Sequence, residues 1–254
     1  MHVLLTGATG RLGRELAPRL EAAGVRVTGL GSRDVNVTDF DAVQRAVDTA
    51  RPDVLFHAAA FTDVAGAETQ REACWCVNVD GTRHVALAAR EVGARLIHVS
   101  SDYVFWGGDD RPKGGYRETD TPGPVRNTYA LTKLVAEEAA RVAPDALIVR
   151  TSFRETAWPH PTAFTDLYTS QDYVDVIADL LASVVLHHAQ IEGGPLHVAT
   201  ERKSVFDLVT RRNPDVTPGS RRDAAVDLPE DVSLDVTRFT QLHATWTTGK
   251  EATA

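Results

Sequence analysis

Cysteine is nearly absent from this chain of 254 residues, which contains only Cys74 and Cys76. The two cysteines lie two positions apart in an expected helix, so they point in different directions and are poorly placed for a disulfide or a metal knuckle. The histidine pair His187 and His188 has no HExxH or CxxC spacing beside it. We therefore interpret both cysteines as packing residues and expect no metal site.

A basic excess is also absent, because 27 Lys and Arg stand against 35 Asp and Glu, for a formal net charge of -8. This balance disfavours nucleic acid as the main partner, and no basic run indicates a membrane surface. No apolar stretch is long enough to span a bilayer, and the start MHVLLTG is not a charged leader followed by a long apolar segment. The sequence thus predicts a cytoplasmic protein with neither a nucleic-acid nor a membrane partner.

Lysine is scarce too, with four lysines and five tyrosines in the chain. Only about 0.08 Tyr-Lys pairs at a spacing of four are expected by chance, yet residues 129–133 read YALTK. On a helix the two side chains share one face, and a fixed ammonium favours the ionised form of a phenol whose free pKa is about 10. The pair predicts an acid or base; the alternative is a surface helix whose ring and cation do nothing together.

Strand-like and helix-like runs alternate along the first 151 residues, and the 43% apolar content can bury a full core. The expected strands, each apolar enough to be covered on both faces, are 2–6, 26–30, 53–58, 95–100 and 146–151. The expected helices are 11–23, 39–50, 72–92 and 127–142. This alternation predicts an α/β fold with a Rossmann-type, doubly wound parallel sheet. Pro18 lies inside the first expected helix and should kink its axis.

The regular alternation of strand-like and helix-like runs ends after Thr151. The later segments are an irregular stretch at 152–171, a strong helix at 172–188, a short strand at 195–199 and a loop or lid at 211–231.

The length fits one large α/β domain, or one domain with a small lobe. We predict a dinucleotide-binding Rossmann domain over 1–151 and a small carboxy-terminal substrate lobe over 152–254. This lobe is interleaved with the last elements of the Rossmann domain.

A glycine-rich turn, TGATGRLG, joins the first expected strand to the first expected helix. Glycines let the backbone approach a pyrophosphate closely, and the amino end of the helix attracts its negative charge. The alternative is an ordinary glycine-bearing turn, but the position between strand and helix favours a dinucleotide site. The candidate cofactor contacts of this turn are Gly7, Thr9, Gly10, Arg11, Leu12 and Gly13.

The second expected strand ends in GLGSR, without the acidic side chain that usually holds the ribose hydroxyls of NAD. Ser32 and Arg33 could instead hold a ribose phosphate through charge-assisted hydrogen bonds. We therefore predict NADP(H) as the preferred cofactor and keep NAD(H) as the alternative, because Arg33 could also be merely solvated.

Several motifs come in one order: TGATGRLG, HAAAFTDVAGAE after the third strand, NVDGT at 78–82, HVSSDYVF after the fourth, and YALTK. This set resembles the extended short-chain dehydrogenase/reductases. Within them, SSDYVF and the stretch RETDTPGPVRNTYALTKLVAEE are similar to the dTDP-4-dehydrorhamnose reductases (RmlD-like). The likeness covers roughly the first 150 residues well and continues more weakly beyond them.

The resemblance implies a catalytic set of Ser101, Tyr129 and Lys133 for an NADPH-dependent carbonyl reductase that acts on a 4-keto nucleotide sugar. Tyr129 would protonate the carbonyl oxygen as hydride arrives, Lys133 would lower the pKa of Tyr129 and hold the nicotinamide ribose, and Ser101 would orient the carbonyl. Further cofactor contacts implied by the resemblance are Ala60, Phe61 and Thr62. The candidate substrate contacts are Ser101, Asp102 and Phe153.

The chain departs from these relatives in two places. The segment after RTS, which in relatives includes a helix that clasps the nucleotide sugar, is short here, so we expect no such helix between Phe153 and Gln171 and a wide substrate cleft. Asn36 stands where many relatives have an acidic residue near the adenine.

Two alternative functions remain open. The first is a non-catalytic, NADP-binding regulatory protein of the same fold, which the short substrate segment favours. The second is a nucleotide-sugar epimerase or dehydratase, which would keep NAD tightly bound. Relatives often pair through the helices expected here at 72–92 and 127–142, so a homodimer is a further expectation.

Overall fold

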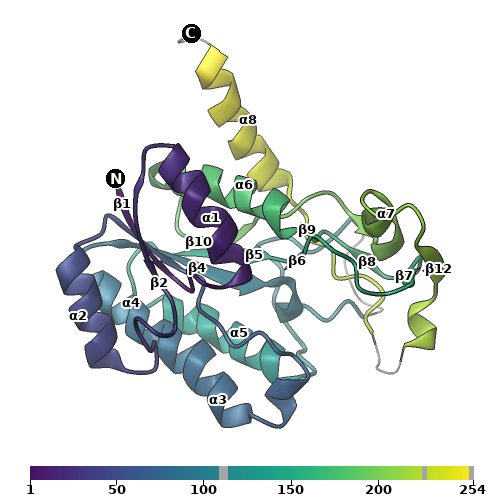
Figure 1. Ribbon diagram of the computed structural model, residues 1–254, viewed down its shortest axis with the longest axis horizontal. Helices are drawn as coiled ribbons and strands as arrows, with labels where there is room; N and C mark the ends of the chain where they lie inside the picture. The colour runs from purple at the N-terminus through teal and green to yellow at the C-terminus, as the bar shows by residue number, and fades with distance from the viewer. Residues whose placement is uncertain (109–113, 225–227, 252–254) are drawn as a thin grey trace.

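A computed structural model describes residues 1–108, 114–224 and 228–251 (Figure 1). Within them, six parallel strands form a central sheet in the order β10-β5-β4-β3-β1-β2. The strands are β1 (His2–Thr6), β2 (Arg26–Leu30), β3 (Val54–His57), β4 (Arg95–Ser101), β5 (Leu147–Thr151) and β10 (Gly194–His197). The predicted parallel sheet is confirmed, and each strand lies within two residues of its predicted bounds.

Helices cover both faces of the sheet, as the doubly wound prediction requires (Figure 1). One face carries α1 (Arg11–Ala22) and α6 (Val174–Leu186), and the other carries α2 (Phe40–Ala50), α4 (Gly81–Val92) and α5 (Thr128–Ala140). Along β1, Val3 and Leu5 belong to the first core while Leu4 belongs to the second. A parallel strand buried on both faces is therefore apolar along its length, which explains the continuous hydrophobic runs.

Helix α1 runs through Pro18 without interruption. Pro18 is exposed, so its ring lies on the outer surface of the helix, while Leu12, Leu16 and Leu20 are buried. The residue without a backbone donor therefore falls on the solvated side of the helix.

The single helix predicted over 72–92 consists of three consecutive segments. Helix α3 (Arg71–Trp75) leads into a π-helical turn, η2 (Cys76–Asp80), and then into α4. Within the π turn, Asn78 is buried, and its amide donates to Thr132 Oγ1 at 2.9 Å.

The two cysteines of this region are free thiols. Cys74 is buried with its Sγ 3.4 Å from Thr132 Oγ1, and Cys76 is half-buried. Cys74 is thus a packing residue, as predicted.

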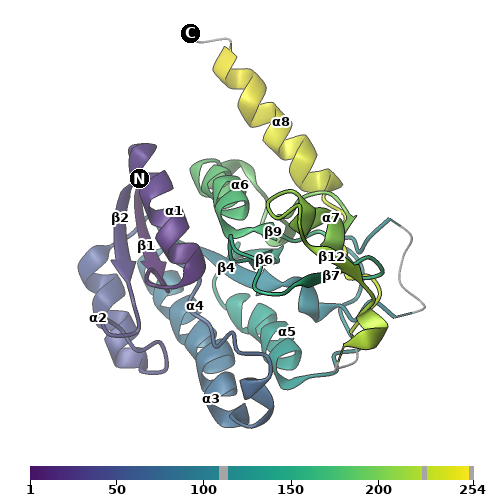
Figure 2. The ribbon, with the colours of Figure 1, turned by 45° about the vertical axis from the view of Figure 1, so that its right-hand side comes forward.

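The smaller lobe lies at one end of the sheet, on the side where β4 and β5 end (Figure 2). Within the described residues, short strand pairs build it, namely β6–β9, β7–β12 and β8–β11. Their bounds are β6 (Phe153–Arg154), β7 (Thr162–Phe164), β8 (Tyr168–Thr169), β9 (Asp172–Tyr173), β11 (Lys203–Ser204) and β12 (Thr217–Gly219), with α7 (Val205–Thr210) beside them. No helix lies between Phe153 and Gln171, as predicted.

The predicted helix over 172–188 begins later, at Val174, because Asp172 and Tyr173 pair with β6. The predicted loop over 211–231 contains β12 and the short 3-10 turn η5 (Arg221–Asp223). Its residues 225–227 lie outside the described residues.

Helix α8 (Thr237–Glu251) follows the lobe and projects away from the body in both views (Figures 1 and 2). Its Phe239 and Trp246 are buried in the core shared with α6. No helix in the described part of the chain is long and apolar enough to cross a membrane.

Candidate active site

A cavity of about 850 Å³ opens at the carboxyl ends of the central strands. Residues that follow β1, β2, β3, β4 and β5 line it on the sheet side, and lobe residues line the rest. In an open parallel sheet this edge, where the strand order reverses between β1 and β3, is where ligands bind. Most of the predicted site residues line this one cavity: Gly7, Thr9, Gly10, Arg11, Leu12, Gly13, Ser32, Ala60, Thr62, Ser101, Asp102, Tyr129, Lys133 and Phe153.

The glycine turn between β1 and α1 has the geometry of a phosphate cradle. Gly7 has a φ of +73°, and a side chain there would lie 2.7 Å from the backbone of Ala58. A side chain at Gly13 would collide with the carbonyl of Gly7. Gly10 caps α1 without any side-chain hydrogen bond, so the amino end of the helix is left to face the cavity. These residues fit a dinucleotide pyrophosphate.

The end of β2 differs from the prediction in one residue. Ser32 lines the cavity, but Arg33 is exposed and is not among the described residues that line it. The adjacent Asp34 accepts the Gly31 N–H at 2.7 Å and so closes the turn. Another exposed arginine, Arg14 of α1, lines the cavity, and sequence reasoning missed it.

The loop after β3 is fixed by Asn78. Its side-chain oxygen accepts the Phe61 N–H at 2.8 Å, and its amide donates to the Phe61 carbonyl at 3.2 Å. Phe61 is not among the described lining residues, whereas Ala60 and Thr62 on either side are. The signal for Asn78 in the sequence was its place in the motif NVDGT. Because Asn78 is buried, its side-chain amide must find several hydrogen-bond partners.

Two side chains fix the amino end of α5, where YALTK begins. Asn127 is the cap, and its side chain accepts the Ala130 N–H at 2.7 Å. Glu68 accepts the Thr128 N–H at 2.5 Å. The first turn of the helix is therefore well defined, and so is the direction of the side chains on it.

The YALTK pair faces the cavity from α5, since Tyr129 and Lys133 both line it. The Ser101 hydroxyl, at the end of β4, is close enough to the Tyr129 phenol to lower its pKa. The structure thus brings the three predicted catalytic residues together, from a strand end and one helix face.

The electrostatics of the pair differ from the prediction. Burial raises the pKa of the Tyr129 phenol well above its usual value, the nearby Ser101 hydroxyl lowers it in part, and Asp102 adds to the rise. Lys133 is buried, and its ammonium donates to the Val99 carbonyl at 2.7 Å. The expected lowering of the Tyr129 pKa is therefore wrong for this arrangement, because burial of the phenol is the largest cause of the shift and raises the pKa.

Burial also acts on Lys133 itself, whose pKa falls to about 8, although the nearby Glu137 raises it in part. Two buried histidines, His57 and His98, lie close to Lys133, and the pKa of each is lowered by burial and by the Lys133 charge. The Thr6 hydroxyl lies 2.7 Å from His57 Nδ1. Both imidazoles are consequently neutral at pH 7, and Lys133 is the charged group beside them.

Asp102 follows Ser101 and is also buried. Burial raises the pKa of its carboxyl to about 6, and hydrogen bonds from Ser152 and Ser101 hold it down in part. The Ser101 hydroxyl lies 3.1 Å from Asp102 Oδ1. A carboxylate at this depth in the cavity can accept hydrogen bonds from the hydroxyls of a sugar.

A buried ion pair that the sequence did not reveal supports the helix that carries Lys133. Glu137, one turn after Lys133, pairs with Arg150 of β5 through two contacts of 2.8 and 2.9 Å. Ser100 also donates to Glu137, at 2.6 Å. The side chains of Arg150 and Glu137 are 3% and 2% exposed, so each charge depends on the other.

Comparison with known proteins decides the family. The family model described as the RmlD substrate binding domain matches residues 1–204. The chain belongs to this family.

Curated relatives of this RmlD-family chain include the dTDP-4-dehydrorhamnose reductase of Streptomyces griseus, 46% identical over 152 residues, which is 59% of this chain and 49% of that protein. The protein of the same name from Mycobacterium tuberculosis (strain ATCC 25618 / H37Rv) is 36% identical over 218 residues, which is 82% of this chain and 65% of that protein. In these alignments the RmlD-family chain spans about half to two thirds of the relative's length.

Solved structures of RmlD-like proteins agree over a longer stretch. The dTDP-4-dehydrorhamnose reductase of Bacillus anthracis, in complex with NADP, superposes with a TM-score of 0.83 at 27% identity, covering 95% of this chain and 92% of that chain. The resemblance drawn from the motifs is thereby confirmed.

Proposed function

We propose that this protein is an NADPH-dependent carbonyl reductase that reduces the 4-keto group of a dTDP-linked deoxysugar. The observation that carries the proposal is the convergence of Ser101, Tyr129 and Lys133 on the cavity that also contains the glycine cradle. Family membership supports the same activity, because relatives are named dTDP-4-dehydrorhamnose reductases.

When bound, NADPH supplies a hydride to the carbonyl carbon. Tyr129 gives its phenolic proton to the carbonyl oxygen, which becomes the hydroxyl of the product. The raised pKa of Tyr129 suits this direction, because the phenol remains protonated at neutral pH. Ser101 orients the carbonyl, and Lys133 holds the nicotinamide ribose and supplies positive charge as the phenolate forms.

The remaining cofactor and substrate contacts are proposed by position. The glycine turn holds the pyrophosphate, and Ser32, Ala60 and Thr62 line the rest of the cofactor side. Asp102 and Phe153 contact the sugar. NADP(H) is the preferred cofactor, as in the Bacillus anthracis complex, with NAD(H) as the alternative.

The proposal also covers the organisation of the chain. Residues 1–151 hold the cofactor and 152–254 contribute the substrate lobe. The protein is cytoplasmic and forms a homodimer through α3, α4 and α5. The non-catalytic alternative rested on a missing substrate wall, but Trp158, Phe164 and Leu167 of the lobe line the cavity, so that reason no longer favours it.

The test is NADPH consumption with a dTDP-4-keto-6-deoxysugar, followed by absorbance in the wild-type protein and in Tyr129→Phe. Loss of the transferable proton should lower turnover by about a hundredfold or more and leave NADPH affinity nearly unchanged. If Tyr129→Phe turned over within a few-fold of wild type, Tyr129 would not be the proton donor. A tightly bound NAD that copurifies with the protein would instead favour the epimerase alternative.

A further inference from the structure

Arg154 is a cavity residue without an assigned role. It follows Phe153 on β6 and lines the same cavity as Asp102 and Tyr103. The guanidinium is close enough to Asp102 for the two charges to act on each other, so it lies on the substrate side of the site. The glycine cradle for the cofactor belongs to a different part of the lining, at the start of α1.

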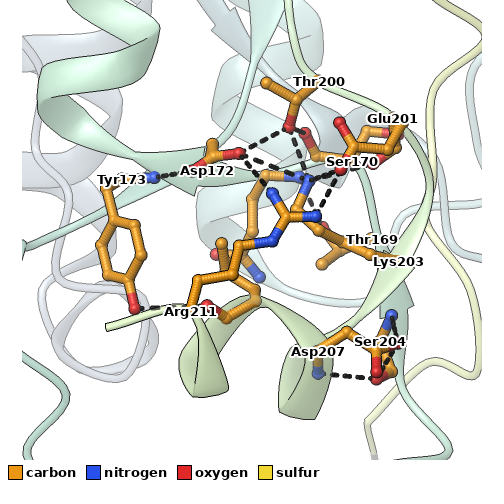
Figure 3. A network of polar contacts seen from close by, with 12 residues as sticks. Thr169, Ser170, Asp172, Tyr173, Thr200, Glu201, Lys203, Ser204, Asp207 and Arg211 are labelled. Atoms are coloured by element: carbon orange, nitrogen blue, oxygen red, sulfur yellow. Dashed lines mark hydrogen bonds and ion pairs between the residues drawn. The ribbon is translucent and has the colours of Figure 1, made fainter. Parts of the chain in front are cut away.

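The lobe holds β6 in a defined place. The β6–β9 ladder pairs Arg154 with Tyr173. Figure 3 shows how β9 is fixed in turn: the Asp172 carboxylate meets the Thr200 hydroxyl at 2.9 Å and the Lys203 ammonium at 3.5 Å. The buried Asp172–Lys203 pair therefore anchors the strand that positions Arg154.

Arg154 stacks on an aromatic ring, with its Cζ 4.4 Å from the centroid of Trp158. Arg212, in the same lobe, stacks in a similar way, with its Cζ 3.9 Å from the centroid of Tyr173. The two arginines differ in their counterions. Arg212 is ion-paired with Asp175 at 2.8 Å, whereas Arg154 has no ion pair with any residue that the structure describes.

The guanidinium plane of Arg154 is fixed from two sides. Its Nε donates to the neutral amide of Gln171, with 3.0 Å between Nε and Oε1. Trp158 is itself held by a hydrogen bond from its indole to the Thr162 carbonyl at 3.0 Å. No described residue accepts from Nη1 or Nη2 of Arg154. Burial lowers the pKa of Arg154 to about 10, so it remains charged at pH 7.

A fixed, charged guanidinium in a cavity wall, with no ion pair among the described residues, is suited to an anion brought by the ligand. The planar fork can give two parallel hydrogen bonds to a phosphoryl group. Because Arg154 belongs to the lobe and acts on Asp102, whereas the glycine cradle is at the start of α1, we assign the anion to the substrate rather than to the cofactor. We propose that Arg154, held against Trp158, forms the subsite for the diphosphate of a nucleoside diphosphate sugar. This inference rests on the proposed function and assigns the residue that holds the diphosphate of the dTDP-linked sugar.

The test measures binding of dTDP, thymidine and NADPH to the intact chain by calorimetry, in wild type and in Arg154→Gln. Loss of a charge-assisted contact of about 1.5 to 3 kcal/mol should weaken dTDP binding by roughly ten- to a hundredfold. Thymidine, which lacks phosphate, and NADPH should bind as before. Arg154→Lys, which keeps the charge but loses the fork, should lose less than Arg154→Gln.

Arg212→Gln is the matched control, because Arg212 also stacks on a ring of the lobe but is already neutralised by Asp175. It should leave dTDP binding unchanged. Equal dTDP affinity in wild type and Arg154→Gln would overturn the inference. So would an equal loss in Arg212→Gln, which would indicate a general effect on the lobe, or a parallel loss of NADPH affinity in Arg154→Gln.

The inference and the proposed function can fail separately. If the wild-type protein reduces the dTDP-linked keto sugar but Arg154→Gln has the same KM, the function stands and the subsite is wrong. If no keto sugar is reduced but dTDP binding depends on Arg154, the subsite stands and the reaction is wrong. Binding of a sugar carboxylate such as glucuronate, without binding of dTDP, would overturn the diphosphate assignment.

Discussion

Lys133 is a cation held beside neutral buried histidines, and its lowered pKa has a consequence for cofactor binding. The pKa of about 8 means that the ammonium is largely charged at pH 7 and loses its proton as the pH rises further. The phenol of Tyr129 does not titrate near this pH, because its pKa is raised by burial. A change in cofactor affinity centred on this pKa therefore reports on Lys133.

We predict that NADPH binds more weakly as the pH rises through about 8. The sign follows from linkage: the negative cofactor favours the charged lysine, so above this pH binding must take up a proton. A loss of about tenfold in affinity by about pH 10 is the expected size. Fluorescence titration of NADPH at several pH values measures it.

Lys133→Met is the control for this prediction. It should bind NADPH weakly at every pH, without the change near the pKa of the lysine. A wild-type affinity that is constant over the whole range would show that the Lys133 charge makes no contribution to binding.

At the scale of elements, the joint between α5 and β5 depends on the buried Glu137–Arg150 pair. We predict that Glu137→Gln lowers the free energy of unfolding by about 3 kcal/mol, because the guanidinium of Arg150 is left buried without a countercharge. Urea unfolding measures the change. Glu138→Gln is the matched control: its pair with Arg141 is exposed, so the change should be within about 0.5 kcal/mol. Similar losses in both variants would contradict this account.

The elements of the sheet could be predicted because their signal is local. A parallel strand buried on both faces must be apolar along its length, so β1, β4 and β5 could be placed with small errors at their ends. Tyr129 and Lys133 could be paired from their helical spacing, whereas Ser101 and the proposed catalytic roles came from the resemblance to the reductases.

Other features depend on contacts between distant segments. The π turn carries Asn78, whose partners Phe61 and Thr132 lie 17 and 54 positions away. The strands β6 to β9 are two or three residues long and are defined by their pairing. The outward position of Arg33 and the rise in the Tyr129 pKa likewise follow from tertiary packing, which no local pattern records.

At the scale of the whole molecule, two large apolar side chains are exposed on the helices proposed for dimerisation. Trp75 of α3 is 40% exposed and Leu131 of α5 is 42% exposed. Helices α3 and α5 contact each other, so both residues belong to one helical layer. Large exposed apolar side chains on two contacting helices support the proposed interface between subunits.

We predict that Leu131→Asp converts the proposed homodimer into a monomer, because a charge at a desolvated interface is costly. Light scattering after gel filtration gives the mass. Thr49→Asp, which changes an exposed residue of α2 instead, should leave the mass unchanged. A monomeric wild-type protein would contradict the proposal of a dimer.

The contact of α1 with α6 bears on the order in which the chain can fold as it leaves the ribosome. Every proposed catalytic residue precedes residue 152, but the sheet face that contains Leu5, Ile97 and Val149 is covered in part by α6, which ends at Leu186. Until that helix has been made, part of this apolar face is open to water.

A fragment of residues 1–151 should therefore aggregate when expressed alone, because α6 is missing from it. Sedimentation would show the aggregation. A soluble fragment that binds NADPH would contradict this prediction.

During translation, all of the proposed catalytic residues are therefore made before α6 can cover this face of the sheet. In that interval chaperones, or neighbouring nascent chains, have access to the face that α6 later closes.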